Sequence, residues 1–384
     1  MITNHLPAER LTNGPDYHWF GYYDKLAFDP TGRYLLAMEV SFEGRMPAPD
    51  DHVKLGMLDL AERNRWIDLA TTSAWCWQQG CMLQWLPGRE NQIIWNDREE
   101  DAYVSRILDV GTGGVRTIPH PIYSVSPDGT TAVTADFRRI DEMRPGYGYA
   151  GLPDPRTHQS VPEDSGIWRV DLQTGSAELI MSIAQIAATT EEHAEAEGVK
   201  HYFNHLLFSP DGQRFVFLNR CGAGGGKRWD TRMFSSRPDG SDIRLVTDGR
   251  GQPVSHFIWR DPDSINVWVA CMRGFYVFAD DGSGQGQLVL EAPDGHQSYL
   301  PGNEWMLYDC YPQDEGVRRL LLCRLTDRQI FEIGRFPSPP EYSGPLRCDL
   351  HPRFSPDGRK VVIDSAHDQG RQLYMLDISE ILDA

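Results

Sequence analysis

The sequence predicts an all-β fold, a seven-bladed β-propeller made of four-stranded antiparallel blades. Three observations carry this prediction. A turn resembling Ser-Pro-Asp-Gly recurs seven times, an apolar β-type run follows each turn, and the 384 residues include 36 Gly and 11 Trp. Four strands repeated at intervals of about 40 residues or more are typical of propeller blades. A chain of this length commonly forms two domains, but repeat folds are not bound by the usual size limit. We therefore expect residues 1–384 to form a single domain.

The seven turns mark the seven units in chain order. They read FDPTG, WLPGR, VSPDG, FSPDG, RDPDS, YLPGN and FSPDG, and their prolines are Pro30, Pro87, Pro127, Pro210, Pro262, Pro301 and Pro356. Proline presets φ at the second position of a turn and Asp-Gly completes it, so each turn predicts a hairpin. The runs that follow, from RYLLAMEV in unit one to RKVVID in unit seven, supply the second strands. A third run, and in most units a fourth, completes the blade.

Two segments depart from the repeat. Unit seven has no outer strand of its own, and the run AERLT at 8–12 resembles one. We therefore expect an N-terminal strand to close the last blade, which removes free sheet edges. Unit three contains an inserted loop at 137–165 that is rich in Pro, Gly and charged residues. Long loops of this kind are either functional or disordered.

Composition narrows the class of partner. The formal net charge is −18, from 37 basic and 55 acidic residues, which argues against nucleic acid and against anionic membrane surfaces. We find no apolar stretch long enough to span a membrane. The seven cysteines are scattered without a C-x-x-C pair, so they predict neither a disulfide framework nor a zinc cluster. The N-terminal segment shows no signal peptide, and we expect a cytoplasmic protein.

Histidines gather at one position of the repeat. Innermost strands line the channel of a propeller, so residues five to seven positions before each turn proline converge at one mouth. Five of the twelve histidines occupy these positions: His120, His205, His256, His296 and His351. Near them lie Asn204, Asp349, His18, Tyr22, Tyr23 and His201. A single histidine is explained by a hydrogen bond to a loop carbonyl, but five converging histidines favour a polar site.

Neutral imidazoles together with a carboxylate suit a divalent metal such as Mn, Zn or Ca. His296, Asp349 and His351 come from the neighbouring units six and seven and form the best predicted metal set. His205 and His256, on the neighbouring units four and five, would then be free for proton transfer.

These features resemble oligogalacturonate lyases and related propeller polysaccharide lyases over essentially the whole chain. The strongest stretches are HYFNHLLFSPDGQRFVF, DTRMFSSRPDGSDIRLV, VSHFIW, DGHQSYL and DLHPRFSPDGRKVVIDS. HWFGYYDK and QGCMLQW look more like the ulvan and rhamnose–glucuronate lyase branches. The resemblance implies β-elimination at a uronic acid of an oligosaccharide, which gives an unsaturated uronate product.

The resemblance also assigns residues by position. It implies His256 as the catalytic histidine and Arg232 as the arginine that acts on the sugar. It places His296 and His351 on two metal ligands and Asp349 on a third, which is a histidine in that family. The glutamine ligand of the family falls near Leu346, which cannot coordinate, so the metal set is altered here.

We therefore expect His205 and His256 to act as base and acid, in an order that the sequence leaves open. Arg232 and the metal would hold the uronate carboxylate, and Tyr22 or Tyr23 would serve as a substitute acid or as a stacking surface for a sugar ring. The expected substrate contacts are Arg220, His201, Asn204, His18, His120 and, from the insertion, Tyr147. The alternative is a non-catalytic propeller that binds a sugar or a protein partner across its face.

Overall fold

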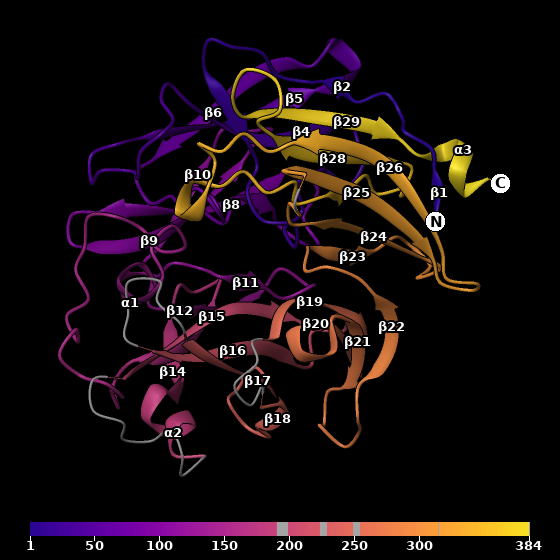
Figure 1. Ribbon diagram of the computed structural model, residues 1–384. Coiled ribbons are helices and arrows are strands. Elements are labelled where there is room, and N and C mark those ends of the chain that lie inside the picture. The colour runs from indigo at the N-terminus through magenta and orange to yellow at the C-terminus, as the bar shows by residue number, and fades with distance from the viewer. Residues whose placement is uncertain (190–198, 223–228, 249–253, 314, 384) are drawn as a thin grey trace.

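The computed structural model describes residues 1–189, 199–222, 229–248, 254–313 and 315–383. Seven small sheets form a ring (Figure 1), and in the first five blades the strands follow one another in chain order from the innermost outwards. The predicted seven-bladed β-propeller is confirmed. Among the described helices, none combines the length and the apolar character needed to cross a membrane.

The first four blades have these strands. Blade one contains β3 (Tyr17–Trp19), β4 (Tyr34–Val40), β5 (Val53–Asp59) and β6 (Arg65–Thr72). Blade two contains β7 (Gln84–Trp85), β8 (Gln92–Glu99), β9 (Ala102–Asp109) and β10 (Val115–Ile118). Blade three contains β11 (Ser124–Val125), β12 (Thr131–Ala135), β13 (Gly166–Asp171) and β14 (Ala177–Ser182). Blade four contains β15 (Lys200–Phe208), β16 (Phe215–Gly222), β17 (Trp229–Ser236) and β18 (Arg244–Thr247).

The last three blades complete the ring. Blade five contains β19 (Val254–Asp261), β20 (Ser264–Val269), β21 (Gly274–Ala279) and β22 (Gln287–Glu291). Blade six contains β23 (Gln297–Tyr299), β24 (Trp305–Cys310), β25 (Val317–Arg324) and β26 (Gln329–Pro337). Blade seven contains β27 (Arg353–Phe354), β28 (Lys360–Ser365) and β29 (Gln372–Asp377). The helices are α1 (Phe137–Met143), α2 (Ile183–Ala187) and α3 (Ser379–Leu382), with short 3-10 turns η1 (Leu60–Glu62), η2 (Ala270–Met272) and η3 (Gly344–Leu346).

The N-terminal segment closes the ring. β2 (Glu9–Arg10) pairs antiparallel with β29 and becomes the fourth strand of blade seven, as the sequence predicted. β1 (Ile2–Thr3) adds a fifth strand to blade six by pairing in parallel with β26, which the sequence did not predict. The first ten residues therefore tie blades six and seven together.

The blade interiors explain why the strands read as continuous apolar runs. Leu35, Leu36, Ala37 and Met38 are consecutive on β4, and all four are fully buried. Side chains on a strand point to opposite faces in alternation, so both faces of this strand must be covered. Neighbouring blades cover both faces, which makes the polar–apolar alternation of a half-exposed sheet unnecessary.

One position of the repeat has an unusual backbone. His205 and His351, each five residues before a turn proline, have positive φ values of 52° and 42°, and Met82 has 59° at the same position of unit two. The pairing of β15 with β16 skips between Asn204 and Leu207, which is a β-bulge. Bulges bend a strand and re-aim a side chain, and positive φ is uncommon outside glycine. The fold therefore holds these two histidines in a constrained orientation at the channel.

The insertion in blade three has more structure than the predicted loop. It begins with α1, which is capped by the Asp136 side chain. The buried Arg139 guanidinium on α1 donates to the carbonyls of His201, Gln159 and Ser160 and pairs with Asp154 at 2.9 Å. These bonds fix the insertion against the start of β15, so it forms a firm wall.

Candidate active site

Four of the five predicted histidines converge on two tyrosines of blade one. The ring centroids of His256 and His296 are 4.1 Å apart, and those of His296 and His351 are 4.2 Å apart. Tyr22 lies 5.2 Å from His205 and 5.0 Å from His351 by the same measure. No member of the set is more than 7% exposed. We call the set the central cluster; it consists of Tyr22, Tyr23, His205, His256, His296 and His351.

The two tyrosines of the central cluster differ in their hydrogen bonds. The Tyr23 hydroxyl donates to the Phe257 carbonyl at 2.7 Å and accepts from the Phe257 amide at 3.0 Å. The Tyr22 hydroxyl is buried and has no hydrogen-bond partner in the part of the chain that the structure describes. Burial raises the pKa of both phenols well above the usual value, so both stay protonated. Tyr23 therefore connects blades one and five, whereas Tyr22 keeps a proton that can be donated.

Carboxylates orient two of the histidines. Asp294 accepts from His256 Nδ1 at 2.9 Å, and the Tyr311 hydroxyl lies 3.4 Å from His256 Nε2. Asp309 accepts from His296 Nδ1 at 3.0 Å and from its backbone amide at 2.7 Å. A carboxylate on Nδ1 fixes the proton there and leaves Nε2 as the basic nitrogen. The Nε2 atom of His296 is therefore available as a ligand, whereas that of His256 faces the Tyr311 hydroxyl.

His205 has a cationic environment. Arg144 donates from Nη1 to His205 Nε2 at 3.2 Å. Burial lowers the pKa of His205 well below its ordinary value, and the charges of Arg144 and Arg220 lower it further. Burial and the neighbouring His296 likewise lower the pKa of His256, against the opposing effect of Asp294. Both imidazoles are consequently neutral near neutral pH, with a nitrogen that can accept a proton.

Arginines and the insertion form the wall beside His205. Burial and Arg144 lower the pKa of Arg220 to about 10, so it still carries a positive charge at neutral pH. The Arg144 guanidinium stacks on the Tyr147 ring at 3.7 Å and donates to its hydroxyl at 3.0 Å, and Arg347 also donates to this hydroxyl. The Tyr147 ring centroid is 5.8 Å from that of His205. The insertion therefore supplies both a cation and an aromatic ring to the site.

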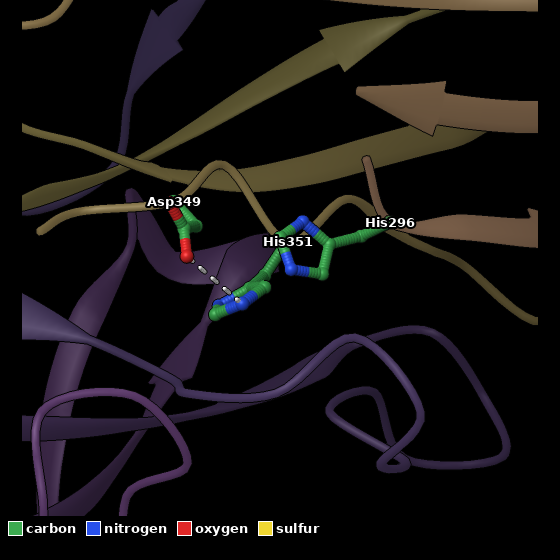
Figure 2. Close-up of side chains that lie close together, drawn as sticks. All are labelled: His296, Asp349 and His351. Atoms are coloured by element: carbon green, nitrogen blue, oxygen red, sulfur yellow. Dashed lines mark ion pairs between the residues drawn. The ribbon is translucent and has the colours of Figure 1, made fainter. Parts of the chain in front are cut away.

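The predicted metal set comes together as Figure 2 shows. Ligand atoms of His296, Asp349 and His351 all lie within 4.8 Å of one another, and His351 Nε2 is 3.8 Å from the Asp349 carboxylate. Both Nε2 atoms are buried and have no hydrogen-bond partner among the described residues. Burial alone would raise the pKa of Asp349, but Arg347 at 2.7 Å and Arg318 at 2.8 Å lower it overall. Two neutral imidazoles and an ionised carboxylate fit a divalent metal.

Two predicted histidines lie outside the central cluster. His18 is bonded through both ring nitrogens, to Gln372 and to Glu39, each at 3.0 Å, and so joins blade one to blade seven. His120 lines a separate cavity of about 250 Å³ with Phe137 and Trp168. His120 is seven residues before its turn proline, and the equivalent of His205 in unit three is the buried Ile122. The expectation that every position from five to seven converges was too broad.

Arg232 is also absent from the cluster, in contrast to the expectation. Its guanidinium donates to the Asn219 side chain at 2.7 Å and to the Ile186 carbonyl at 3.2 Å, beside α2. Arg220 lies on β16, where its charge acts on His205. Arg232 on β17 pairs with Asn219 on β16, the residue before Arg220. Because successive residues of a strand face opposite sides of the blade, Arg232 and Arg220 point in opposite directions, and Arg220 is the one on the side of His205.

The remaining two predicted contacts lie on β15. His201 is buried at the start of this strand, where its carbonyl accepts from Arg139. Asn204 is fully buried next to His205, and its side-chain amide has no hydrogen-bond partner among the described residues. Asn204 thus remains a substrate contact to be tested, and His201 anchors the insertion.

The sequence did not single out several residues that act on the cluster: Arg144, Asp294, Asp309, Tyr311, Arg318 and Arg347. Asp294 lies two residues before His296, and Arg347 two residues before Asp349. Residues two apart in an extended chain point to the same side. The spacing to His296 and Asp349 could therefore have predicted that Asp294 and Arg347 lie near the site. Asp309 is on β24 and reaches His296 across the hairpin, a contact that only the fold creates.

Comparisons with known proteins agree on the fold. No protein-family model matches the chain, and no curated protein sequence matches it. It is similar to the solved structure of an oligogalacturonate lyase from Vibrio parahaemolyticus, at 15% identity over 97% of this chain and 93% of that one, with a TM-score of 0.69. An oligogalacturonate lyase in complex with manganese is similar at 16% identity over 100% of both chains, with a TM-score of 0.70.

Tricorn protease is a further structural neighbour, at 13% identity over 97% of this chain and 35% of that one, with a TM-score of 0.52. At these identities the likeness establishes the propeller fold. Propellers of lyases and of peptidases both resemble this chain, so its activity has to be argued from the site itself.

Proposed function

We propose that this chain is a lyase that cleaves uronate-containing oligosaccharides by β-elimination. The observation that carries the proposal is the convergence of four histidines and two tyrosines in one buried cluster, with two arginines beside it. The ring centroids of neutral His205 and protonated Tyr22 are 5.2 Å apart. A neutral imidazole that can accept a proton and a phenol that can donate one are the pair that an elimination needs.

The arginines provide the place for the uronate carboxylate. The proton at C5 of a uronic acid is weakly acidic as long as the neighbouring carboxylate carries its full charge. Fixed positive charges that pair with this carboxylate stabilise the enolate-like state that forms when C5 loses its proton. Arg220 is buried and Arg144 is half-buried beside His205, and we assign the carboxylate to them.

The proton transfers then balance between two side chains. Neutral His205 accepts the C5 proton at Nε2, the atom to which Arg144 donates until its guanidinium pairs with the substrate carboxylate. The electron pair of the C5–H bond forms the C4–C5 double bond. The C4–O4 bond breaks, and Tyr22 donates its phenol proton to the leaving oxygen. His256, held by Asp294 and Tyr311, is the second residue able to act as a base. Histidine suits this task near neutral pH.

A divalent metal would be held by the Nε2 atoms of His296 and His351 and by the Asp349 carboxylate. When bound, it would supply Lewis-acid stabilisation of negative charge on the substrate. Two nitrogen donors favour Mn or Zn over Ca, which prefers oxygen ligands alone. The like-charged pair Arg347 and Arg318 keeps Asp349 ionised whether or not metal is present.

The test is a panel of oligosaccharides containing galacturonate, glucuronate or iduronate. The protein is incubated with each, and formation of the C4–C5 unsaturated product is followed by its ultraviolet absorbance. We expect product from at least one member, formed at least about 100-fold more slowly by the His205→Ala protein under the same conditions. Binding of a panel member without any product from the whole panel would instead identify a non-catalytic sugar-binding propeller.

A further inference from the structure

The backbone amide of His205 lies in the β-bulge of β15 and is bonded by a side chain of another blade. The pairing of β15 with β16 passes from Asn204 to Leu207 and skips His205. A buried backbone N–H without an acceptor is costly, so the bulge requires an acceptor from elsewhere. The Tyr123 hydroxyl supplies it and accepts from the His205 amide at 2.8 Å. Tyr123 directly precedes β11, the innermost strand of blade three.

The Tyr123 hydroxyl is itself held in one orientation. It donates at 2.9 Å to the side-chain oxygen of Gln79, from the segment before β7, and its buried ring stacks on that of Phe137. Burial raises the pKa of Tyr123, so the phenol stays protonated and its proton remains on the bond to Gln79. A lone pair of the same oxygen is therefore left for the His205 amide. Because its proton is committed in this way, Tyr123 does not compete with Tyr22 as the acid.

The ring of His205 depends on its main chain more than the rings of His256 and His296 do. Carboxylates bond those two rings through Nδ1, at 2.9 and 3.0 Å. In the described part of the chain no carboxylate bonds the His205 ring, and Arg144 donates to its Nε2. That bond is lost in the proposed reaction, when the Arg144 guanidinium pairs with the uronate. The ring is then placed by its main chain and by the aromatic rings around it.

The main-chain conformation that Tyr123 stabilises is one that histidine rarely adopts. His205 has a φ of 52°, in the left-handed region that is uncommon outside glycine. Such a conformation persists only where the surrounding structure holds it. If the amide lost its acceptor, the peptide would turn towards another partner and would turn the ring with it. A displacement of about 1 Å at a reacting group can cost about 100-fold in rate.

Other histidines of the central cluster are held from neighbouring blades in the same way. Asp309 of blade six accepts from the His351 amide at 3.2 Å. The Tyr23 hydroxyl of blade one accepts at 3.0 Å from the amide of Phe257, the residue after His256. In three places, therefore, a side chain from another blade accepts the main-chain amide at or next to a histidine of the cluster. The contact to His205 is one case of a device that this fold repeats.

We propose that Tyr123 is a positioning residue that places His205 for removal of the C5 proton. The inference rests on the proposed lyase function and adds to it a residue from outside the central cluster. Tyr123 acts through the His205 main chain and does not touch the substrate. Its loss should therefore slow the chemical step and leave substrate binding unchanged.

The first test separates kcat from KM in two variants that each lose one hydroxyl between blade three and β15. Tyr123→Phe keeps the buried ring and removes the acceptor of the His205 amide. The matched control is Ser124→Ala, because the Ser124 hydroxyl accepts from the Phe208 amide, on the same strand, at 3.1 Å. We expect Tyr123→Phe to lower kcat by about 10–100-fold with KM within about twofold of the wild-type value. Ser124→Ala should shift the urea midpoint about as much and keep kcat within about twofold.

Gln79→Leu tests the same contact in a protein that keeps the tyrosine. It removes the acceptor of the Tyr123 proton but leaves the oxygen facing the His205 amide, so kcat should decrease less than in Tyr123→Phe. On an active enzyme, a kcat of Tyr123→Phe within about twofold of the wild-type value would overturn the positioning role and leave the lyase function standing. An equal loss of kcat in Ser124→Ala would overturn it as well, because the effect would then come from folding.

The second test does not require catalysis. Hydrogen exchange of single backbone amides is followed by NMR in the wild-type protein and in both hydroxyl variants. We expect the His205 amide to exchange at least about tenfold faster in Tyr123→Phe and at the wild-type rate in Ser124→Ala. The ring signals of His205, assigned by their loss in His205→Ala, should move in Tyr123→Phe alone. An unchanged exchange rate or unmoved ring signals in Tyr123→Phe would contradict the positioning role, whether or not a substrate has been found.

Discussion

His205 and His351 occupy the same position of the repeat, yet a carboxylate lies beside only one of them. Each is five residues before a turn proline, and each has a positive φ, 52° and 42°. His205 faces Arg144 and Arg220, whereas His351 faces the ionised Asp349. The repeat therefore decides where a histidine points, and the neighbours from other segments decide its chemistry. A base and a metal ligand can arise from one structural position.

The largest effect on kcat should follow from removing His205, the histidine beside the two arginines. His205→Ala should lower kcat by about 10²–10⁴-fold, the contribution expected of a general base. Initial rates of unsaturated product formation measure this effect. His120→Ala is the control, since His120 lies in a separate cavity and should leave kcat within about twofold of the wild-type value. Comparable losses in both variants would show that the change acts through folding.

Tyr22 and Tyr23 test whether the acid has been assigned correctly. Tyr22→Phe should lower kcat by about 10²-fold or more, because it removes the only proton proposed for the leaving oxygen. Tyr23→Phe should leave the Phe257 amide without its partner and lower the free energy of unfolding by about 1–3 kcal/mol. Kinetics and urea denaturation of the two proteins separate these effects. If Tyr23→Phe caused the larger loss in kcat, the assignment would be reversed.

Metal affinity should depend on His351 and be independent of His205. His351→Ala removes a proposed ligand and should weaken Mn²⁺ binding by at least about 100-fold, more than loss of an outer-shell partner does. His205→Ala should bind Mn²⁺ as the wild-type protein does. Isothermal titration calorimetry of the metal-free proteins with Mn²⁺ and Zn²⁺ provides both values. Unchanged affinity in His351→Ala would remove the metal from this site.

The smallest effect is on the pH dependence of stability. Burial lowers the pKa of His205 below the value of about 6.5 that it has in the unfolded chain. The unfolded state therefore takes up the proton first as the pH falls, so the free energy of unfolding is full above about pH 6.5 and decreases below it. His205→Gln should make this decrease shallower. Urea denaturation at several pH values between about 7 and 5 measures it, and an identical slope would contradict the buried neutral state.

The sequence predicted the fold well because the propeller is periodic. Seven Pro-containing turns fixed the number of blades, and the five-residue offset located His205, His296 and His351. β1 was missed because a strand of two residues, Ile2–Thr3, has no pattern to detect.

Most of the expected residues that the structure brings together follow the repeat, and Tyr147, from the insertion, is the exception. Arg144 comes from the insertion and Arg347 from the segment before blade seven, and neither lies at a repeated position. His120 was included because we expected every position from five to seven residues before a turn proline to converge, and His120 lies seven before. Arg232 was assigned by resemblance along the strand, but the strand alternation directs it towards α2. Long-range contacts of this kind depend on how the blades pack, which one sequence does not show.

The most direct test of the central claim is the fate of oxygen from water during cleavage. Elimination breaks the C4–O4 bond without adding water, whereas hydrolysis adds it. The reaction is run in water labelled with heavy oxygen, on a substrate that the protein cleaves, and the products are weighed by mass spectrometry. We predict two products, one of which is lighter than the corresponding hydrolysis product by one molecule of water, with no heavy oxygen at its unsaturated end. Products that are each of the hydrolysis mass, with labelled water added across the broken bond from the earliest time points, would contradict β-elimination at the central cluster.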